Sequence, residues 1–562
     1  GVRQDNAEAN SEITYDGLGR VASTKAPAPT AGATRVESTV NYLAGATEFH
    51  VVGASEPHGF SKKVTYDSLF RTTSETDLAN LTTYTQWHND KDLVLSTTDP
   101  TGLKSTTIYN EDDLPVDSYG PAPASWFGSD NKPLAGEVNN VPHVKSGYDE
   151  GITGLGVAYY NNKKLLSAPK LNSTSTWATS ADVKETFANG SAPVTPTDGW
   201  SARYTGKIKL SATGNHSFKL RGDAGFRLYI DDELIVDGWG GGTLSGGDNT
   251  VSGATAFNNT EANSTHRIRI EQYHAATGAT SIQLYMTAPS ASETSVLSSI
   301  LSPNYGLTTS TTSYDSQLGN LTSNIQYSKP EYGLVSSTTL DPTGLNLQSQ
   351  ATYESAGSGF LRQTSKTLPG GTTTQYEYYS ATDTRDNPCT PATESTLQSG
   401  FIKRKIEQDP DAAGSQQSRT SEYVYDDSGS TVAARYGNEP WICTTTDQRG
   451  RVIETLVPTI GAKLGRTITN NFAVNNNPLI TSTSDSSGTI TVENDLLGRT
   501  IKYTDANGRV TENAYDQFSN LVNRSSIVGV ESYDYDQFDR LTTYKLDNVT
   551  FSTINYDQYG RV

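Results

Sequence analysis

The stretch YDQYGRV, residues 556–562, has the chemistry of a tight corner between two β-strands. Asp557 stands where a type I turn favours Asp or Asn, and Gly560 stands where the chain must leave the turn with a positive φ. Tyr556 and Val562, on either side of the corner, are strand-forming residues. The stretch therefore predicts a β-hairpin whose loop has about three to four residues.

The same corner recurs along the chain at a nearly fixed step. Near the C-terminal end it is repeated at Asp495, Asp516, Asp536 and Asp557, and the steps between these residues are 21, 20 and 21 residues. It also follows Tyr15 and Tyr66, and a second turn signal, DPTGL, begins at Asp99 and Asp341. A fixed period of this length indicates a repeat architecture in which each unit consists of two short strands and two turns.

These units resemble the YD repeats of the Rhs family, which includes bacterial polymorphic toxins, insecticidal toxin-complex shell proteins, cell-wall-associated repeat proteins and teneurins. The resemblance covers roughly residues 1–140 and 300–562. It implies an all-β fold in which antiparallel hairpins coil into a spiralling sheet that closes into a hollow shell, often around a toxin domain. We also expect the natural chain to continue beyond Val562, because a repeat unit is interrupted there.

The composition agrees with a thin repeat sheet. Only 34% of the 562 residues are hydrophobic, while Tyr and Gly number 31 and 49. The sequence contains no run of about 18 apolar residues that could cross a membrane. The net charge of −19 argues against nucleic acid or an anionic membrane as the main partner, because phosphate binding needs a positive field.

Residues 144–290 interrupt the repeat pattern. The segment 199–240 contains four strand-like runs separated by Gly-rich or Asp-rich turns. HRIRIEQY (266–273) alternates strictly, which puts its Ile residues and Gln272 on one face and its Arg residues and Glu271 on the other. Six or more antiparallel strands in about 145 residues predict a β-sandwich or barrel. We therefore divide the chain into a first repeat segment, an inserted domain and a second repeat segment: 1–143, 144–290 and 291–562.

The insert resembles the lectin-like domain named after anthrax protective antigen. The stretches that carry the resemblance are GLGVAYY (154–160), WSARYTGKI (200–208) and GDAGFRLYIDDELIVDGW (222–239), in the same order and at the same spacing. The resemblance implies a carbohydrate-binding module of the kind found in adhesins, glycosidases and toxins. In the sugar-binding members, two consecutive Asp residues joined by a cis peptide hold a calcium ion, which in turn holds sugar hydroxyls.

The matching position in this sequence is Asp223-Ala224, so one carboxylate is missing. Tyr273 stands where a second loop of the yeast flocculins supplies Asn. Asp223 is therefore the one retained candidate for a metal ligand, and we expect a trans peptide, no bound metal and at best weak calcium binding. We predict ligand contacts from Asp223, Tyr273 and Trp239, with stacking of sugar on the rings; the alternative is that Trp239, like Trp200, belongs to the core or rim of the domain.

The two cysteines, Cys389 and Cys443, lie in the turn-rich contexts RDNPCTP and EPWICTTTD. They could be free thiols of a cytosolic protein. Buried free cysteines usually stand in apolar runs, however, so we predict a disulfide and with it an extracellular setting, either secreted or at the cell surface.

The sequence contains neither HExxH nor GxSxG, and its seven His residues form no catalytic pattern, so we expect no enzyme. Two functions stay open. The chain is either the wall of an Rhs-type shell that encapsulates and delivers a toxin and carries a glycan-binding insert, or a surface adhesin in which the repeats form a stalk. The expected partners are glycans, the rest of its own chain and an enclosed C-terminal toxin. A glycoside hydrolase is a poorer third option, because no catalytic barrel is present.

Overall fold

The computed structural model describes residues 10–29, 32–42, 48–53, 61–77, 79–175, 185–187, 193–194, 199–222, 225–239, 249–274, 280–355, 360–391, 393, 395–410 and 417–562. Within these residues every regular element is a strand, apart from three short 3₁₀ segments, η2 (Ala124–Trp126), η3 (Ser298–Ile300) and η4 (Pro330–Tyr332). The all-β fold predicted from the sequence is confirmed. No helix in this part of the chain has the length and apolar character needed to span a membrane.

Most of the described chain forms one antiparallel sheet of 31 strands. Its strands are β1 (Glu12–Tyr15), β2 (Val21–Lys25), β3 (Glu37–Tyr42), β4 (Glu48–Gly53), β5 (Ser61–Tyr66), β6 (Thr72–Thr76), β7 (Thr82–Trp87), β8 (Val94–Thr98), β9 (Leu103–Tyr109), β10 (Pro115–Pro123), β11 (His143–Tyr148), β25 (Thr308–Tyr314), β26 (Leu321–Lys329), β27 (Leu334–Leu340), β28 (Leu347–Tyr353), β29 (Gln363–Thr367), β30 (Thr373–Tyr378), β33 (Ile402–Glu407), β34 (Arg419–Tyr425), β35 (Thr431–Tyr436), β36 (Ile442–Thr446), β37 (Val452–Val457), β38 (Arg466–Asn471), β39 (Ile480–Asp485), β40 (Gly488–Asn494), β41 (Thr500–Thr504), β42 (Val510–Tyr515), β43 (Leu521–Ser526), β44 (Gly529–Tyr535), β45 (Leu541–Leu546) and β46 (Val549–Thr553). Each strand pairs with the next one, and β11 pairs directly with β25, so the sheet continues past the insert.

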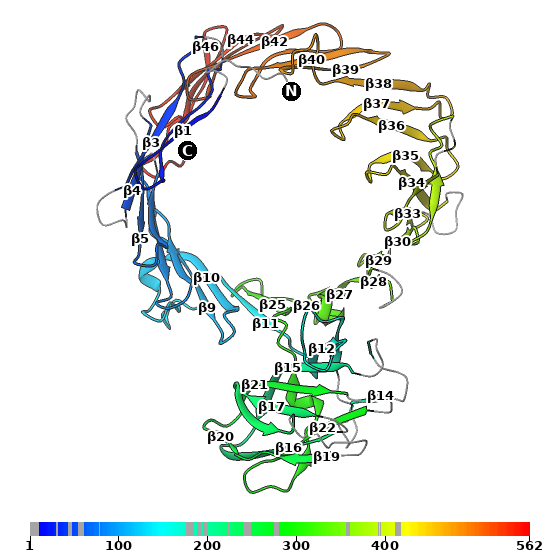
Figure 1. The fold of residues 1–562 in the computed structure, drawn as a ribbon. Coiled ribbons are helices and arrows are strands. Elements are labelled where there is room, and N and C mark those ends of the chain that lie inside the picture. The colour runs from blue at the N-terminus through cyan, green and yellow to red at the C-terminus, as the bar shows by residue number, and fades with distance from the viewer. Residues whose placement is uncertain are drawn as a thin grey trace.

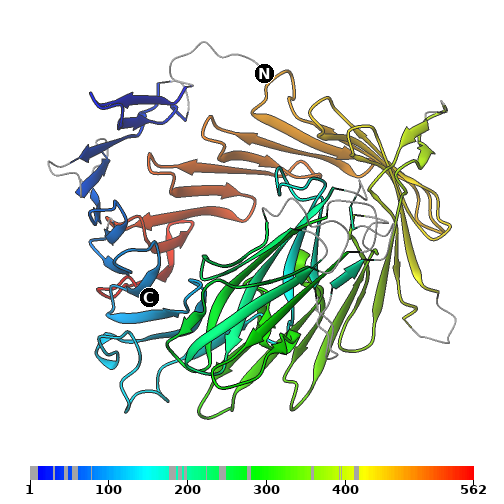
Figure 2. The same ribbon diagram turned by 60° about the horizontal axis from the view of Figure 1, so that its bottom comes forward.

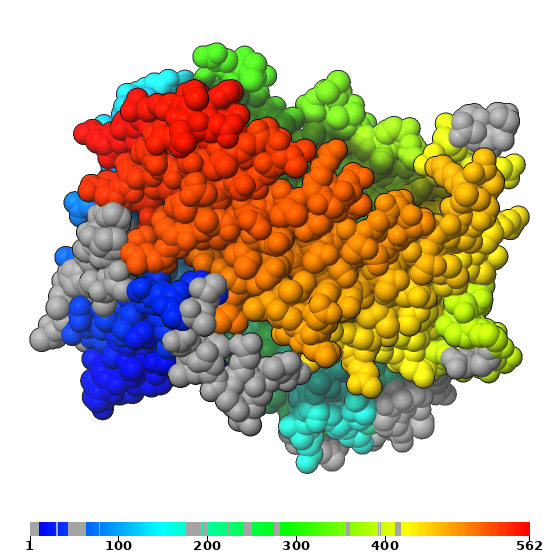
Figure 3. All heavy atoms as spheres, turned by 90° about the horizontal axis from the view of Figure 1, so that it is seen from above, coloured from blue at the N-terminus to red at the C-terminus, as the bar shows by residue number. Residues whose placement is uncertain are grey.

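The sheet bends into a spiralling ring, and its N-terminal strands lie beside its C-terminal ones (Figures 1 and 2). The backbone N–H of Leu496 donates to the carbonyl of Pro29 over 3.3 Å, which joins the two ends of the ring. Seen from above, the C-terminal strands form a continuous surface with the N-terminal segment at its edge (Figure 3). The bending has a local source, because the pairing register shifts just before the Tyr of many repeat corners, as at Tyr66, Tyr515 and Tyr535. Such β-bulges bend a strand and increase its twist.

The aspartate of each repeat closes its own corner. At Asp536, Oδ1 accepts the backbone N–H groups of Phe538 (2.8 Å) and Arg540 (3.0 Å), and Oδ2 accepts Nε of Arg540 (2.7 Å). The same set of bonds is present at Asp16, Asp67, Asp447, Asp495 and Asp557. Gly560 has a φ of 78°, as the turn chemistry requires. The Asp, Gly and Arg of the repeat therefore build a corner that needs no other part of the chain.

The tyrosine of each repeat joins its unit to the preceding one. The hydroxyl of Tyr535 donates to the carbonyl of Leu521 over 2.9 Å, and that of Tyr556 donates to the carbonyl of Leu541 over 2.9 Å. The guanidinium of Arg540 lies 4.4 Å from the centre of the Tyr556 ring, which is a cation–π distance. Hydrogen bonds and ring contacts between units thus take the place of a thick apolar core.

The insert is a β-sandwich that lies outside the ring (Figure 1). One sheet contains β13 (Leu171–Ser175), β12 (Leu155–Tyr160), β15 (Ser201–Leu210), β21 (Ser264–Tyr273), β17 (Phe226–Ile230) and β18 (Glu233–Asp237), with β24 (Leu301–Ser302) on β15. The other contains β14 (Glu185–Phe187), β22 (Thr280–Thr287), β16 (Gly214–Gly222) and β19 (Asn249–Ser252), with β20 (Phe257–Asn259) on β16 and β23 (Thr294–Ser295) on β22. Side chains from both sheets fill the core, and Trp200 is among them with 1% of its surface exposed.

Strand pairing moves the junctions of the insert away from residues 144 and 290. β11 pairs with β10 and β25, so residues 144–148 belong to the large sheet. β23 and β24 follow residue 290, yet they pair with strands of the insert, and Val296 and Leu301 lie in its core. The repeat motif marks corners rather than strand partners, and from the strand pairing we propose junctions near residues 149 and 303 in place of 144 and 290.

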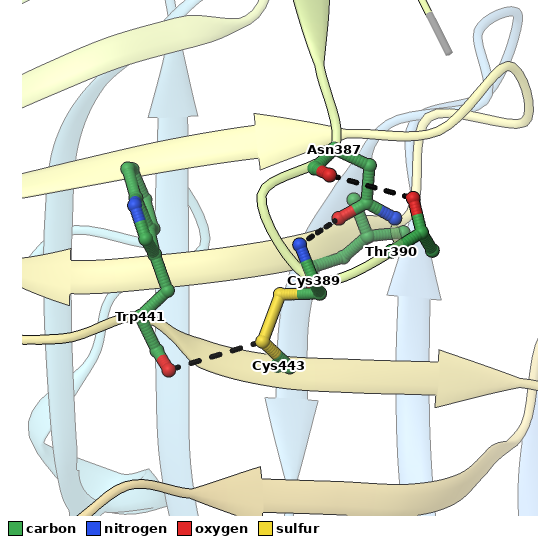
Figure 4. Close-up of a disulfide and its surroundings, with 6 residues drawn as sticks. Asn387, Cys389, Thr390, Trp441 and Cys443 are labelled. Atoms are coloured by element: carbon green, nitrogen blue, oxygen red, sulfur yellow. Dashed lines mark hydrogen bonds between the residues drawn. A yellow bond between two sulfur atoms is a disulfide. The ribbon is translucent and has the colours of Figure 1, made fainter. Parts of the chain in front are cut away.

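A small excursion, residues 380–398, leaves the large sheet between β30 and β33 and contains a two-stranded ribbon, β31 (Thr384–Asp386) and β32 (Ser395–Leu397). A disulfide joins Cys389 of this excursion to Cys443 of β36, with 5.7 Å between their Cα atoms (Figure 4). The ring of Trp441 lies 4.5 Å from the guanidinium of Arg435 and 5.4 Å from that of Arg385 in the excursion. The excursion is thus held on the sheet by a covalent bond and by ring contacts.

Candidate functional site

The outer face of the insert carries a row of charged side chains across three neighbouring strands. The register places Arg203 of β15 and Arg227 of β17 on either side of Glu271 of β21. Ile268, Ile270 and Gln272 are buried on the opposite face of β21, as the alternation of the sequence predicts. The charged residues of β21 therefore point away from the core.

Glu271 is the centre of this row. Its carboxylate accepts Nε of Arg203 over 2.8 Å and Nε of Arg227 over 2.5 Å, and Nε of Arg269 lies 3.9 Å away. Burial would raise the pKa of Glu271, but the hydrogen bonds from Arg203 and Arg227 outweigh it and hold the pKa below its usual range. One carboxylate thus faces three guanidinium groups, and Asp237 of β18 stands opposite Arg227 in the register, so these five groups carry a net charge of +1.

Aromatic rings surround the arginines. The Arg227 guanidinium lies 4.4 Å from the centre of the Trp239 ring, and the Tyr273 ring stands edge-on to Trp239 at a centroid distance of 5.0 Å. The Arg269 guanidinium lies 4.0 Å from the Tyr229 ring. Gly225 is required beside Tyr273, because a Cβ at this position would clash with the tyrosine ring. The Arg203 guanidinium lies 5.9 Å from the Tyr160 ring. We call this set of residues the arginine–aromatic face: Tyr160, Arg203, Arg227, Tyr229, Trp239, Arg269, Glu271 and Tyr273.

Two of the three predicted ligand residues, Tyr273 and Trp239, meet on this face. Asp223 and Ala224 lie outside the described residues, so the expected trans peptide and weak calcium site stay predictions. Among the residues that the structure describes, no group of three His, Cys, Asp or Glu side chains is placed to hold a metal ion. Arg203, Arg227 and Glu271 were not predicted as site residues, although the alternation of HRIRIEQY already places Glu271 on the outer face.

The other end of β15 and β21 borders a cleft of about 810 Å³ between the insert and the large sheet. Lys207 of the insert forms an ion pair with Asp112 of the large sheet across this cleft. Ser264, His266 and Asp231 line the cleft and are linked by hydrogen bonds of 2.9 Å and 2.8 Å, which resembles a catalytic triad.

The Ser264 hydroxyl is, however, also bonded to Oδ1 of Asn259 and to the carbonyl of Glu261, each over 2.7 Å. Its single proton is therefore shared among three acceptors, and a nucleophile needs that proton to pass to the histidine. No catalytic function is evident at this cleft.

Residues 151–299 match the family model of the PA14 domain. The match supports the resemblance to the protective-antigen-type domain that the sequence suggests. No curated protein matches the chain.

Three solved structures illustrate what the chain is similar to. The PA14 sugar-binding domain from an RTX adhesin is 16% identical; the match covers 27% of this chain and 100% of that domain, with a TM-score of 0.21. An anti-sigma factor domain-containing protein from Clostridium clariflavum is 24% identical, with 27% of this chain and 47% of that chain covered and a TM-score of 0.23. TcdB2-TccC3 is 10% identical, with 99% of this chain and 28% of that chain covered and a TM-score of 0.21. The chain spans 47% and 58% of the first two relatives.

Proposed function

We propose that the insert is a carbohydrate-binding module held in a fixed orientation on a β-sheet shell, and that the protein acts outside the cell or at its surface. The observation that carries this proposal is the arginine–aromatic face, which lies in a domain that matches the PA14 family. The half-buried rings of Trp239 and Tyr273 offer apolar surface on which a sugar ring can stack, while their polar neighbours provide hydrogen bonds.

The contacts between the insert and the large sheet support a fixed orientation. The carboxylate of Asp149, where the chain enters the insert, accepts the backbone N–H groups of Tyr305, Gly306 and Leu307, where it leaves. The hydroxyl of Thr174 donates to Glu331 of η4 over 2.9 Å. Together with the ion pair between Lys207 and Asp112, these bonds connect the insert to the large sheet at several places.

We further propose that the large sheet is the structural wall of an Rhs-type YD-repeat shell that encloses and delivers a toxin. The ring of 31 strands and the corner chemistry of each repeat support this proposal. The alternative is a surface adhesin in which the same repeats form a stalk for the insert. Protease treatment of the natural protein separates the two, because a shell protects an enclosed fragment and a stalk does not.

Glycan binding is tested on a glycan array with the full chain and two variants, Trp239→Ala and Tyr273→Ala. Loss of a stacking ring should weaken binding about tenfold, while Tyr436→Ala, which removes an exposed ring from the large sheet, should leave it unchanged. We expect the same affinity with and without EDTA, because Ala224 cannot coordinate calcium. Unchanged binding in both ring variants would place the ligand elsewhere, and loss of binding in EDTA would show that calcium governs the site.

A further inference from the structure

We propose that the arginine–aromatic face selects acidic saccharides, meaning glycans that carry carboxylate or sulfate groups. This inference rests on the proposed carbohydrate binding and names the class of sugar. The chain as a whole carries a charge of −19, yet this face gathers three arginines around the buried Glu271 and the exposed Asp237, which leaves a local positive charge. A local cluster of positive charge on an acidic protein attracts anionic ligands to that part of the surface.

Arg203 and Arg227 have N–H donors that are available to a ligand. Arg203 and Arg227 bond to Glu271 through Nε, and within the described residues their terminal amino groups make no hydrogen bond. These side chains are 36% and 30% exposed, so solvent and ligands reach them. Arginine pairs with carboxylate or sulfate through two parallel N–H donors, and such charge-assisted bonds are stronger than neutral ones.

Arg269 adds an unmet donor in the middle of the face. Its Nε is buried and has no hydrogen-bond acceptor in the part of the chain that the structure describes. The Tyr229 ring holds its guanidinium plane from one side, at 4.0 Å. Buried donors without a partner are rare in folded proteins, because each one costs free energy.

The face is long enough for an oligosaccharide. Tyr273, Glu271, Arg269 and Arg267 alternate along the same side of β21, and these six residue steps span about 20 Å. The rings of Trp239 and Tyr273 lie at one end of this line, and the cleft with Lys207 and Arg267 borders the other. A chain of acidic sugars can therefore stack on the rings and place its anionic groups beside Arg227, Arg203 and Arg269, whereas Arg267 is paired with Asp232.

The test uses a matched pair of ligands: an oligogalacturonate and the same oligosaccharide with its carboxylates methyl-esterified. Calorimetry with the full chain at low salt should show the acidic form binding about tenfold more tightly than the ester, and the difference should shrink as salt rises. Equal affinity for the two forms, or tighter binding of the ester, would overturn the inference while leaving carbohydrate binding intact. Failure to bind any sugar on the array would instead remove the proposed function itself.

Two sets of variants assign the effect to the face. Arg203→Gln with Arg227→Gln should reduce binding of the acidic form to the level of the ester. The control, Arg419→Gln with Arg449→Gln, removes the same charge from exposed positions of the large sheet. It should change the affinity for neither the acidic form nor the ester. Glu271→Gln keeps the shape of the side chain and removes the negative charge, so the acidic form should bind several-fold more tightly. Weaker acidic binding in a folded Glu271→Gln protein would contradict the electrostatic argument.

Discussion

Tyrosine illustrates how much a single residue type does in the repeats. From the sequence, the tyrosine before each corner is only a strand former. In the structure its hydroxyl reaches the carbonyl of the preceding unit, as Tyr535 reaches Leu521, and its ring receives the arginine of that unit, as Tyr515 receives Arg499 at 4.6 Å. A residue that contributes both an apolar ring and a hydrogen bond suits a sheet that has little core.

Tyr535→Phe should therefore weaken the junction between two units. The change removes a hydroxyl that bonds to Leu521 over 2.9 Å and keeps the ring, so local opening should become easier by about 1 kcal/mol. Hydrogen exchange of the β43 and β44 amides should accelerate about fivefold. Tyr503→Phe is the control, because the Tyr503 hydroxyl makes no hydrogen bond within the described residues; equal acceleration in both variants would contradict the role of the Tyr535 hydroxyl.

At the scale of the element, many hairpin corners are closed by an ionised aspartate. Burial would raise the pKa of Asp536, but bonds from Arg540 and from the backbone outweigh it and lower the pKa. At Asp557 a backbone hydrogen bond from Arg561 is the largest cause, and its pKa is lowered as well. The pKa values of the corner residues Asp16, Asp67 and Asp447 are lowered as well, so protonation in acid weakens several corners together.

The large sheet should consequently be stable at neutral pH and lose stability in acid. A folded pKa below the unfolded one means that the stabilisation is present above the unfolded pKa and is lost as the pH falls through the folded pKa. The unfolding temperature should stay level between about pH 5 and 8 and fall below about pH 4. In Asp536→Asn, exchange of the Arg540 amide should be faster at pH 7 and less sensitive to acid. A fall in stability centred near pH 6 would assign the transition to histidine instead.

The disulfide acts on one element, the excursion 380–398. It closes a loop with a sequence separation of 54, which corresponds to about 4 kcal/mol on the chain-entropy account. In Cys389→Ser with Cys443→Ser, we expect the excursion to be cleaved faster by protease while strands β33 to β36 keep their protection. Mass spectrometry without reductant should find the two cysteine peptides linked; recovery of both thiols alkylated would contradict the bond.

At the scale of the whole molecule, a sandwich with its own core is inserted into a sheet that has almost none. The core residues gather in the insert, from Trp200 and Phe226 to Val296 and Leu301, whereas side chains of the large sheet are mostly half-buried. We therefore expect the insert to fold by itself and the large sheet to depend on the stacking of its units.

A polypeptide of residues 149–303 should be soluble and melt cooperatively. A polypeptide of residues 144–290 is the control, because it lacks η3, β23 and β24 and with them Val296 and Leu301, which are 1% and 2% exposed in the structure. Losing these two buried side chains should cost about 3 to 6 kcal/mol. Circular dichroism during heating measures the unfolding temperature of each polypeptide. Equal stability of the two polypeptides would show that the insert does not need the segment after residue 290.

The sequence by itself determined what is local. The hydrogen bonds of each corner lie within five residues, so Asp557 and Gly560 predict the turn without knowledge of the strand partners. The alternation of HRIRIEQY likewise assigns each side chain to a face. Only the tertiary structure decided which strands become neighbours: that β11 pairs with β25 across the insert, that β24 closes the insert after residue 290, and that Arg203 and Arg227 meet at Glu271. These contacts join residues that are about 40 to 170 positions apart in the sequence, a separation that the local repeat pattern does not cover. They form because a buried Glu271 and a buried sandwich core both require partners from distant strands.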